Sequence, residues 1–253
     1  MIHPTAVVDS VLPDDVQIGA YAVIGPDVQA GTGVRIGPHA YVTGPVFIGD
    51  SVSIGPSAVI GTDPQDLKYD GERTELHIGS GTVIREFANI NRGTVESGKT
   101  VIGSDCLIMA YVHVAHDCII GDRVILANAV NMAGHVEIGS DVIIGGVVPI
   151  HQFVRIGDYA MIGGGFRVSK DVPPFVLAGG LPLGVRALNL VGLRRKDFSR
   201  ERLDSLDRAF RHLFREDGTL TSKALGLIED PNTSDDVKQL ANFILSSSRG
   251  VIS

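Results

Sequence analysis

The chain has 253 residues, a hydrophobic content of 44% and a formal net charge of −7, so it can bury a substantial core and is a poor candidate for nonspecific nucleic-acid binding. Its two cysteines are too few for a disulfide framework, and no apolar run is long enough to span a membrane. Because the N-terminus also lacks the basic and apolar regions of a signal peptide, we expect a cytoplasmic protein without a transmembrane segment.

A period of six residues dominates the sequence from residue 18 to residue 168. Aliphatic side chains occupy every sixth position in three series, at Ile18, Ile24, Ala30, Ile36, Val42, Ile48, Ile54 and Ile60, at Ile78, Ile84 and Ile90, and then without a break from Ile102 to Val168. Weaker copies reach back to Ala6 and Leu12. This period fits neither an isolated helix nor a simple strand, and it predicts a hexapeptide-repeat parallel β-helix over residues 1–186.

Each hexapeptide is expected to form one short strand of a three-sided coil. Three hexapeptides close the coil, so residue i lies below residue i+18. Glycine often follows the aliphatic residue, as at Gly103 and Gly121, and we expect it to supply the backbone angles of the corner. Cys106 and Cys118 are two hexapeptides apart and should lie on different sides of the coil, unable to form a disulfide.

Two stretches interrupt the repeat. The polar, turn-rich sequence 62–74 predicts a loop that projects from the coil, within an excursion placed at 62–77. A shorter interruption, 96–99, precedes the long unbroken series.

The period ends after Pro173-Pro174, and helical patterning begins near Leu188. We expect an α-helical C-terminal domain over 187–253, with its main helix in 198–214, Ser199 as N-cap, and shorter helices near 222–229 and 234–246. The expected buried face of the main helix consists of Leu203, Leu206, Phe210 and Leu213. Residues 186–215 carry nine Lys or Arg against four Asp or Glu, which indicates either a solvated face or a landing patch for an acidic partner.

The histidines are the clearest candidates for chemistry. Under eighteen-residue stacking, Gly134 lies over His116 and His135 lies over Asp117. The polar residues that should share this ridge are His113, His116, His135 and Gln152, and His151 falls within the same part of the repeat. An imidazole suits general-base catalysis, and the backbone N–H of Gly134 can stabilise an oxyanion. Asp117 is a candidate for orienting His116, although neighbours on a strand would face opposite ways.

Alternative chemistries remain open at this point. No Ser or Cys nucleophile accompanies the histidines, which favours direct transfer over a covalent intermediate. Histidines on a β-helix could instead hold zinc, as in the gamma-class carbonic anhydrases, but no tight ligand motif such as CxxC or HExxH is present. We therefore expect no metal and no cofactor. The remaining alternative is a β-helix with a purely structural role and no catalytic activity.

Short motifs along the chain carry a family resemblance. They are QDLKY (65–69), NRGTV (91–95), AHDC (115–118), ILAN (125–128), AGHV (133–136), HQF (151–153), DVPP (171–174) and GLRR (192–195). With these motifs the chain resembles the UDP-N-acetylglucosamine O-acyltransferases that open lipid A biosynthesis. The resemblance runs over almost the whole chain and includes the helical tail.

The resemblance implies a homotrimer of left-handed parallel β-helices that transfers a 3-hydroxyacyl group from acyl carrier protein to the 3-hydroxyl of UDP-N-acetylglucosamine. By position, His116 matches the general base and Gly134 the oxyanion-stabilising backbone. The positions that match substrate contacts are Asp66 and Lys68 in the projecting loop, His113, His135, His151 and Gln152 around the sugar diphosphate, and Asn189 and Arg195 near the nucleotide. The basic tail matches the docking site for acyl carrier protein.

Compared with the family pattern, three positions bear on substrate specificity. Val191 stands where the family often has Glu, and Lys196 stands where it often has Arg, so the nucleotide contacts are expected to differ. The family's acyl-chain ruler falls at Gly164, where a glycine leaves room for an acyl group of about fourteen carbons.

Related enzymes are alternatives. The same fold acting on the 3-amino sugar analogue would form an amide. The sibling N-acyltransferase carries an additional N-terminal uridine-binding domain, for which repeats that begin by Ile18 leave no room. An acetyl-CoA-dependent acetyltransferase would have a shorter helix and lack the tail that matches carrier-protein docking.

Overall fold

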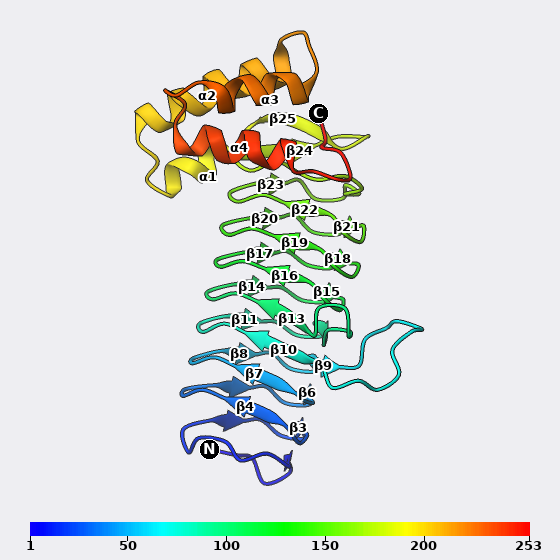
Figure 1. The fold of residues 1–253 in the computed structure, drawn as a ribbon. Coiled ribbons are helices and arrows are strands. Elements are labelled where there is room, and N and C mark those ends of the chain that lie inside the picture. Colours follow the sequence, from blue (N-terminus) through cyan, green and yellow to red (C-terminus); the bar gives the residue numbers. More distant parts are fainter.

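Short strands wind around one axis into a three-sided column, and helices cover its C-terminal end (Figure 1). The computed structural model describes residues 1–253. Each side of the column is a sheet in which strands from successive coils pair in parallel, apart from the antiparallel pair β24 and β25. The predicted fold class, a left-handed parallel β-helix followed by a helical region, is confirmed.

The three sheets together contain all of the strands. The eight-stranded sheet contains β1 (Val7–Val8), β3 (Val23–Ile24), β6 (Tyr41–Val42), β9 (Val59–Thr62), β12 (Asn89–Asn91), β15 (His113–Val114), β18 (Asn131–Met132) and β21 (Pro149–Ile150). The seven-stranded sheet contains β4 (Val28–Ala30), β7 (Val46–Ile48), β10 (Glu75–Ile78), β13 (Lys99–Ile102), β16 (Ile119–Ile120), β19 (Glu137–Ile138) and β22 (Arg155–Ile156). The ten-stranded sheet contains β2 (Gln17–Ile18), β5 (Arg35–Ile36), β8 (Ser53–Ile54), β11 (Val83–Ile84), β14 (Leu107–Ile108), β17 (Ile125–Leu126), β20 (Ile143–Ile144), β23 (Met161–Ile162), β24 (Val176–Gly179) and β25 (Gly184–Leu188).

The register follows the predicted stacking. His113 pairs with Asn131, eighteen residues on, and Ile102 pairs with Ile120. The repeat aliphatics are buried and form the long hydrophobic core. Across the projecting loop, Ile60 pairs with Ile90, thirty residues on. Across the second interruption, Ile78 pairs with Ile102, twenty-four residues on. Both interruptions therefore leave the column without breaking the stack.

The N-terminal coil does not keep the predicted phase. Val8, rather than Ala6, pairs with Ile24, and Ile2 pairs with Ile18, so this coil is two residues short. The weak copy assigned to Ala6 is wrong by two residues, whereas Leu12 packs against the core.

The corners are formed by non-glycine residues with a left-handed backbone, and not by glycine as expected. From Asp105 to Tyr159, every sixth residue has a left-handed backbone with φ between 55° and 62°, and none of these residues is glycine. Gly103 and Gly121 have no positive φ; a Cβ on either would lie 2.5 Å or 2.8 Å from the backbone of the next coil. Glycine is thus required there by close approach of neighbouring coils, and our expectation that it supplies the corner angles is wrong.

Four helices form the C-terminal layer: α1 (Leu190–Arg195), α2 (Arg200–Arg215), α3 (Leu220–Glu229) and α4 (Asp235–Leu245). Ser199 caps α2 as predicted, accepting a hydrogen bond from the backbone N–H of Arg202, and Leu206, Phe210 and Leu213 are buried. The hairpin of β24 and β25 and the short helix α1 were not predicted. No helix of the structure is both long and apolar enough to cross a bilayer.

The end of the chain returns to the column. Val251 pairs with Asp171, Ile252 is buried, and the Ser247 hydroxyl donates to the Asp171 carboxylate at 2.7 Å. The division into a β-helix domain, 1–186, and a helical domain, 187–253, stays a prediction.

Candidate active site

His116 and Asp117 lie in one corner, between β15 of the eight-stranded sheet and β16 of the seven-stranded sheet. Asp117 is the left-handed residue of this corner, with φ of 61°. Its carboxylate therefore turns back beside the preceding residue, and Oδ2 lies 2.7 Å from His116 Nδ1. The doubt that strand neighbours face opposite ways does not apply, because both residues belong to the turn.

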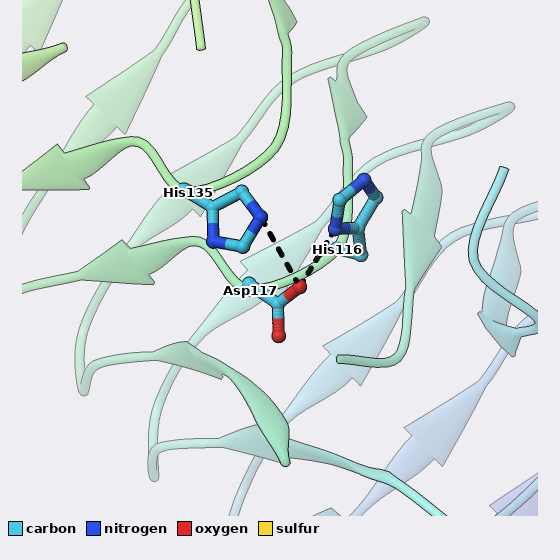
Figure 2. Close-up of side chains that lie close together, drawn as sticks. All are labelled: His116, Asp117 and His135. Carbon is cyan, nitrogen blue, oxygen red and sulfur yellow. Dashed lines mark hydrogen bonds and ion pairs between the residues drawn. The ribbon is translucent and has the colours of Figure 1, made fainter. Parts of the chain in front are cut away.

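His135 occupies the equivalent place in the next coil. Its Nε2 lies 3.7 Å from Asp117 Oδ2, and its ring meets that of His116 edge-on at 5.2 Å between centroids (Figure 2). On its far side it stacks on Phe153 at 4.6 Å, as the predicted column requires. Glu96 also reaches His135 Nε2, at 3.2 Å.

Four hydrogen-bond donors surround the buried Asp117 carboxylate. Oδ1 accepts from the Thr94 backbone N–H at 2.9 Å and from the Ser97 hydroxyl, and Oδ2 accepts from the Thr94 hydroxyl at 2.7 Å and from His116. Burial by itself disfavours the charged form, but the donors from Ser97, Thr94 and His116 outweigh it and hold the pKa of Asp117 below its usual value. Because a carboxylate can only accept, His116 Nδ1 carries the proton and Nε2 is left as a base.

Gly134 lies directly over the His116 ring. A Cβ at this position would be 2.5 Å from His116 Cε1, so only glycine leaves the ring in place. Other coils carry larger residues at the equivalent position, such as Ala110, Asp122 and Gln152, which shows that the corner itself does not require glycine. The Gly134 backbone N–H has no hydrogen-bond partner. Both observations agree with the predicted open space and free donor above the imidazole.

The hydrogen bonds of this cluster argue against a metal site here. Ligand atoms of His116, Asp117 and His135 lie within 4.8 Å of one another. However, the four donors already use the acceptor capacity of the Asp117 carboxylate, and protonated Nδ1 cannot ligate a cation. Zinc bound by all three residues would have to break this network.

The other predicted ridge residues and His151 differ in their burial and in their hydrogen-bond partners. His113 Nδ1 lies 3.0 Å from the Asn89 side-chain oxygen; burial, with a further effect from nearby His116, lowers the pKa of His113. His151 Nδ1 accepts from the Arg249 guanidinium at 3.1 Å, a contact to the returning C-terminus that sequence reasoning missed. Gln152 is exposed, and its side chain makes no hydrogen bond.

The remaining predicted residues do not contact the histidines within one chain. Asp66 Oδ1 accepts from the Lys68 backbone N–H at 3.0 Å in the projecting loop, while the Lys68 ammonium is free. Asn189 caps α1: its side chain accepts from Gly192 and donates to the Tyr159 carbonyl at 2.9 Å, a structural role. Arg195 and Gly164 are exposed.

Two features of the sequence now have a structural explanation. Lys196 Nζ lies 2.6 Å from the nearly buried Asp141, which also accepts from Arg123, so Lys196 ties the end of α1 to the column. Both cysteines are free and buried as expected, and burial raises the pKa of the Cys118 thiol to about 12, which removes it as a nucleophile.

Sequence reasoning missed the residues that hold Asp117, namely Thr94 and Ser97. Ser97 lies in the interruption 96–99 and Thr94 lies two residues before it, where stacking arithmetic gives no neighbours. The only available signal was the interruption itself, which places six additional residues immediately before the coil that contains His116.

Comparison with known proteins decides the family. The UDP-N-acetylglucosamine O-acyltransferase domain 2 model matches residues 171–252, and the six-repeat bacterial transferase hexapeptide model matches 9–44 and 99–134. The acyl-[acyl-carrier-protein]–UDP-N-acetylglucosamine O-acyltransferase of Xanthomonas axonopodis pv. citri is 46% identical over all of this chain and 97% of its own length. This chain belongs to the UDP-N-acetylglucosamine O-acyltransferase family.

Solved structures of the family agree with this assignment. A UDP-N-acetylglucosamine acyltransferase crystal structure matches with a TM-score of 0.96 and 43% identity, covering 100% of this chain and 98% of the other. The enzyme from Campylobacter jejuni matches with a TM-score of 0.90 and 42% identity, covering 100% and 99%. The O-acyltransferase family therefore accounts for the column and the helical layer together.

Proposed function

We propose that this O-acyltransferase transfers a 3-hydroxyacyl group from acyl carrier protein to the 3-hydroxyl of UDP-N-acetylglucosamine, the first step of lipid A biosynthesis. The observation that carries the proposal is the His116–Asp117 hydrogen bond beneath the free N–H of Gly134. It provides a base whose tautomer is fixed and an oxyanion donor at the same point. The names of the relatives supply the donor and acceptor classes.

The reaction follows from these groups. His116 Nε2 takes the proton of the sugar 3-hydroxyl as its oxygen attacks the thioester carbonyl carbon. Asp117 stabilises the imidazolium that forms, and the Gly134 N–H stabilises the tetrahedral oxyanion. The C–S bond then breaks, and the imidazolium returns its proton to the departing thiolate. No covalent enzyme intermediate is needed, which agrees with the absence of a reactive thiol beside the cluster.

Substrate contacts are assigned from the family match and the exposed positions. Asp66 and Lys68 reach the sugar and acyl group from the projecting loop; His113, His135, His151 and Gln152 line the sugar diphosphate. Arg195 contacts the nucleotide, with Asn189 shaping that region through its cap of α1. Gly164 is exposed, and the family match assigns it as the acyl ruler, where the absence of a side chain leaves room for a long acyl group.

Carrier-protein docking is proposed at the helical layer. Several of its cations are neutralised internally, such as Arg202 by Asp236 and Arg211 by Asp207. Arg194, Arg195 and Arg208 have no acidic partner and remain for an acidic carrier protein. The nucleotide sugar and the carrier are intracellular compounds, so we propose a cytoplasmic location.

The family resemblance implies a homotrimer, and one apolar surface supports an interface between copies of the chain. Tyr21, Phe87, Tyr111 and Val147, each 50–67% exposed, lie along the corner between the ten-stranded and eight-stranded sheets. Beside them, the outward residues of the ten-stranded sheet form an apolar row of Leu107, Ile125, Ile143 and Met161. A surface this apolar is typical of an interface, and further copies of the chain would cover it.

A mass-spectrometric assay tests the proposed reaction. Wild type and His116→Ala are incubated with UDP-N-acetylglucosamine and 3-hydroxyacyl carrier proteins of graded length. We expect a UDP-3-O-acyl product from wild type, a loss of turnover by about 10²- to 10⁴-fold in the variant, and unchanged folding. Product from His116→Ala at the wild-type rate would contradict the assignment of the base.

The same assay separates the related activities. Preference for a ten-carbon donor over a fourteen-carbon donor would contradict the ruler at Gly164. Turnover only with the 3-amino sugar would replace the ester by an amide product.

A further inference from the structure

The segment 93–99, which contains the second interruption of the repeat, folds over the catalytic corner. It adds no apolar residue to the core, which passes from Ile90 directly to Ile102. Its polar residues instead turn toward the site: Thr94 and Ser97 donate to Asp117, and Glu96 reaches His135. The interruption therefore contributes contacts to the site and not to the hydrophobic interior of the column.

Of the two residues that donate to Asp117, Thr94 makes the stronger contact. It is 6% exposed and bonds both carboxylate oxygens of Asp117, through its backbone N–H at 2.9 Å and its hydroxyl at 2.7 Å. Two parallel bonds fix the plane of the carboxylate as well as its position. Ser97 has one hydroxyl proton and two acceptors, Asp117 and the Lys99 carbonyl; the charged carboxylate is the better acceptor.

A second corner aspartate shows what is unusual about this arrangement. Asp141 occupies the same turn position in a later coil and is also buried, but two cations, Arg123 and Lys196, bind its carboxylate. Asp117 is held by uncharged hydroxyl and amide donors instead. These donors keep the carboxylate ionised without adding a compensating charge, so its negative charge remains available to a protonated His116.

We propose that Thr94 and Ser97 are positioning residues of the transfer reaction, which hold the Asp117 carboxylate so that His116 keeps its proton on Nδ1 and presents Nε2 to the acceptor hydroxyl. This inference rests on the proposed function of the site. Neither residue touches substrate in this assignment; both act through Asp117.

The charged surroundings determine the expected pH behaviour. The titratable groups facing Asp117 are His116, His135 and the Cys118 thiol, with Glu96 beyond His135 and His113 beside His116. Thr94 and Ser97 stabilise the ionised, unprotonated His116–Asp117 pair. Their removal therefore raises the apparent pKa at which the pair takes up a proton, and the acidic limb of kcat/KM moves to higher pH.

The kinetic test compares Thr94→Val, Ser97→Ala and the double variant with matched controls elsewhere in the column. Thr82→Val removes a buried hydroxyl that donates to the Gly103 carbonyl, and Ser140→Ala removes a corner hydroxyl that accepts from Asp122. We expect kcat to fall about 10- to 100-fold per site variant, as for loss of a donor to a charged group. KM and the controls should stay near wild type, while Thr94→Ser and Ser97→Thr should restore kcat.

The tautomer of His116 gives a readout that does not depend on turnover. With ¹⁵N-labelled histidine, wild type should show the Nδ1–H form, and the double variant a mixture of forms. A wild-type tautomer, kcat and pH profile in the double variant would overturn the proposal. Absence of product from wild type with every donor would instead refute the proposed function, and the tautomer measurement would still decide whether Thr94 and Ser97 hold the pair.

Discussion

At the scale of single residues, the site depends on a left-handed turn. Aspartate tolerates a positive φ better than most residues, and at position 117 this angle brings its carboxylate to the histidine that precedes it. Adjacent residues can therefore act as a base and its orienting group. The next coil then supplies Gly134 and His135 from the same position in the repeat.

Asp117→Asn tests the role of the carboxylate charge. The amide keeps the size of the side chain but cannot stabilise an imidazolium, and its NH2 group faces donors from Thr94 or Ser97. We expect kcat to fall about 10²- to 10⁴-fold, the range of general-base catalysis, with little change in KM. Asp141→Asn is the matched control, because it alters a buried aspartate at the same turn position away from the histidines. An equal loss of kcat in both variants would indicate a fold defect.

The residues that sequence reasoning could place are those that obey the repeat. Stacking by eighteen predicts from the sequence alone that Gly134 lies over His116 and His135 over Asp117. The repeat does not encode which residue takes the left-handed angle, so the direction of the Asp117 side chain was misjudged and the role of Gly103 was misread. Thr94, Ser97 and Arg249 lie outside the periodic part, and their contacts depend on how irregular segments return to the column.

At the scale of elements, one segment joins the projecting loop to the catalytic corner. Arg92 holds the base of the loop: its guanidinium donates to the Gly61 carbonyl at 2.6 Å, to Asp63 and to the Tyr69 hydroxyl at 3.0 Å. Two residues later, Thr94 binds Asp117. The loop that we propose to contact substrate is thus anchored next to the groups that react with it.

Arg92→Met tests this anchoring. The variant keeps an apolar stem but removes the guanidinium bonds to the loop, while the Arg92 backbone N–H still donates to the Thr62 carbonyl. Substrate must then order part of the loop when it binds. Ordering one residue costs about 1–2 kcal/mol, and we expect KM for the sugar nucleotide to rise about 10-fold or more, with a smaller change in kcat. Arg73→Met is the control, because its ion pair with Asp27 is exposed on both sides and should contribute little. An unchanged KM in Arg92→Met would separate the anchor from substrate binding.

At the scale of the whole molecule, each coil buries its aliphatic residues against the coils above and below, so the stack supports a site on its surface without rearranging its interior. The helical layer and the returning C-terminus cover the last coils, where Ile252 is buried and Arg249 reaches His151. One corner stays apolar and exposed in the single chain. We propose that a second copy of the chain brings together the site residues of the projecting loop and those of the helical layer.

Val147→Asp tests whether this corner is the subunit interface. Val147 is 67% exposed and has φ of 58°, a backbone conformation that suits aspartate better than valine, so the folded single chain should tolerate the change. Burying the new charge between copies costs several kcal/mol per ion, and we expect sedimentation to show monomers with little transferase activity. Ile119→Asp is the control, because Ile119 is exposed on the seven-stranded sheet, away from that corner. If Val147→Asp sediments as a trimer with full activity, the copies associate through another face.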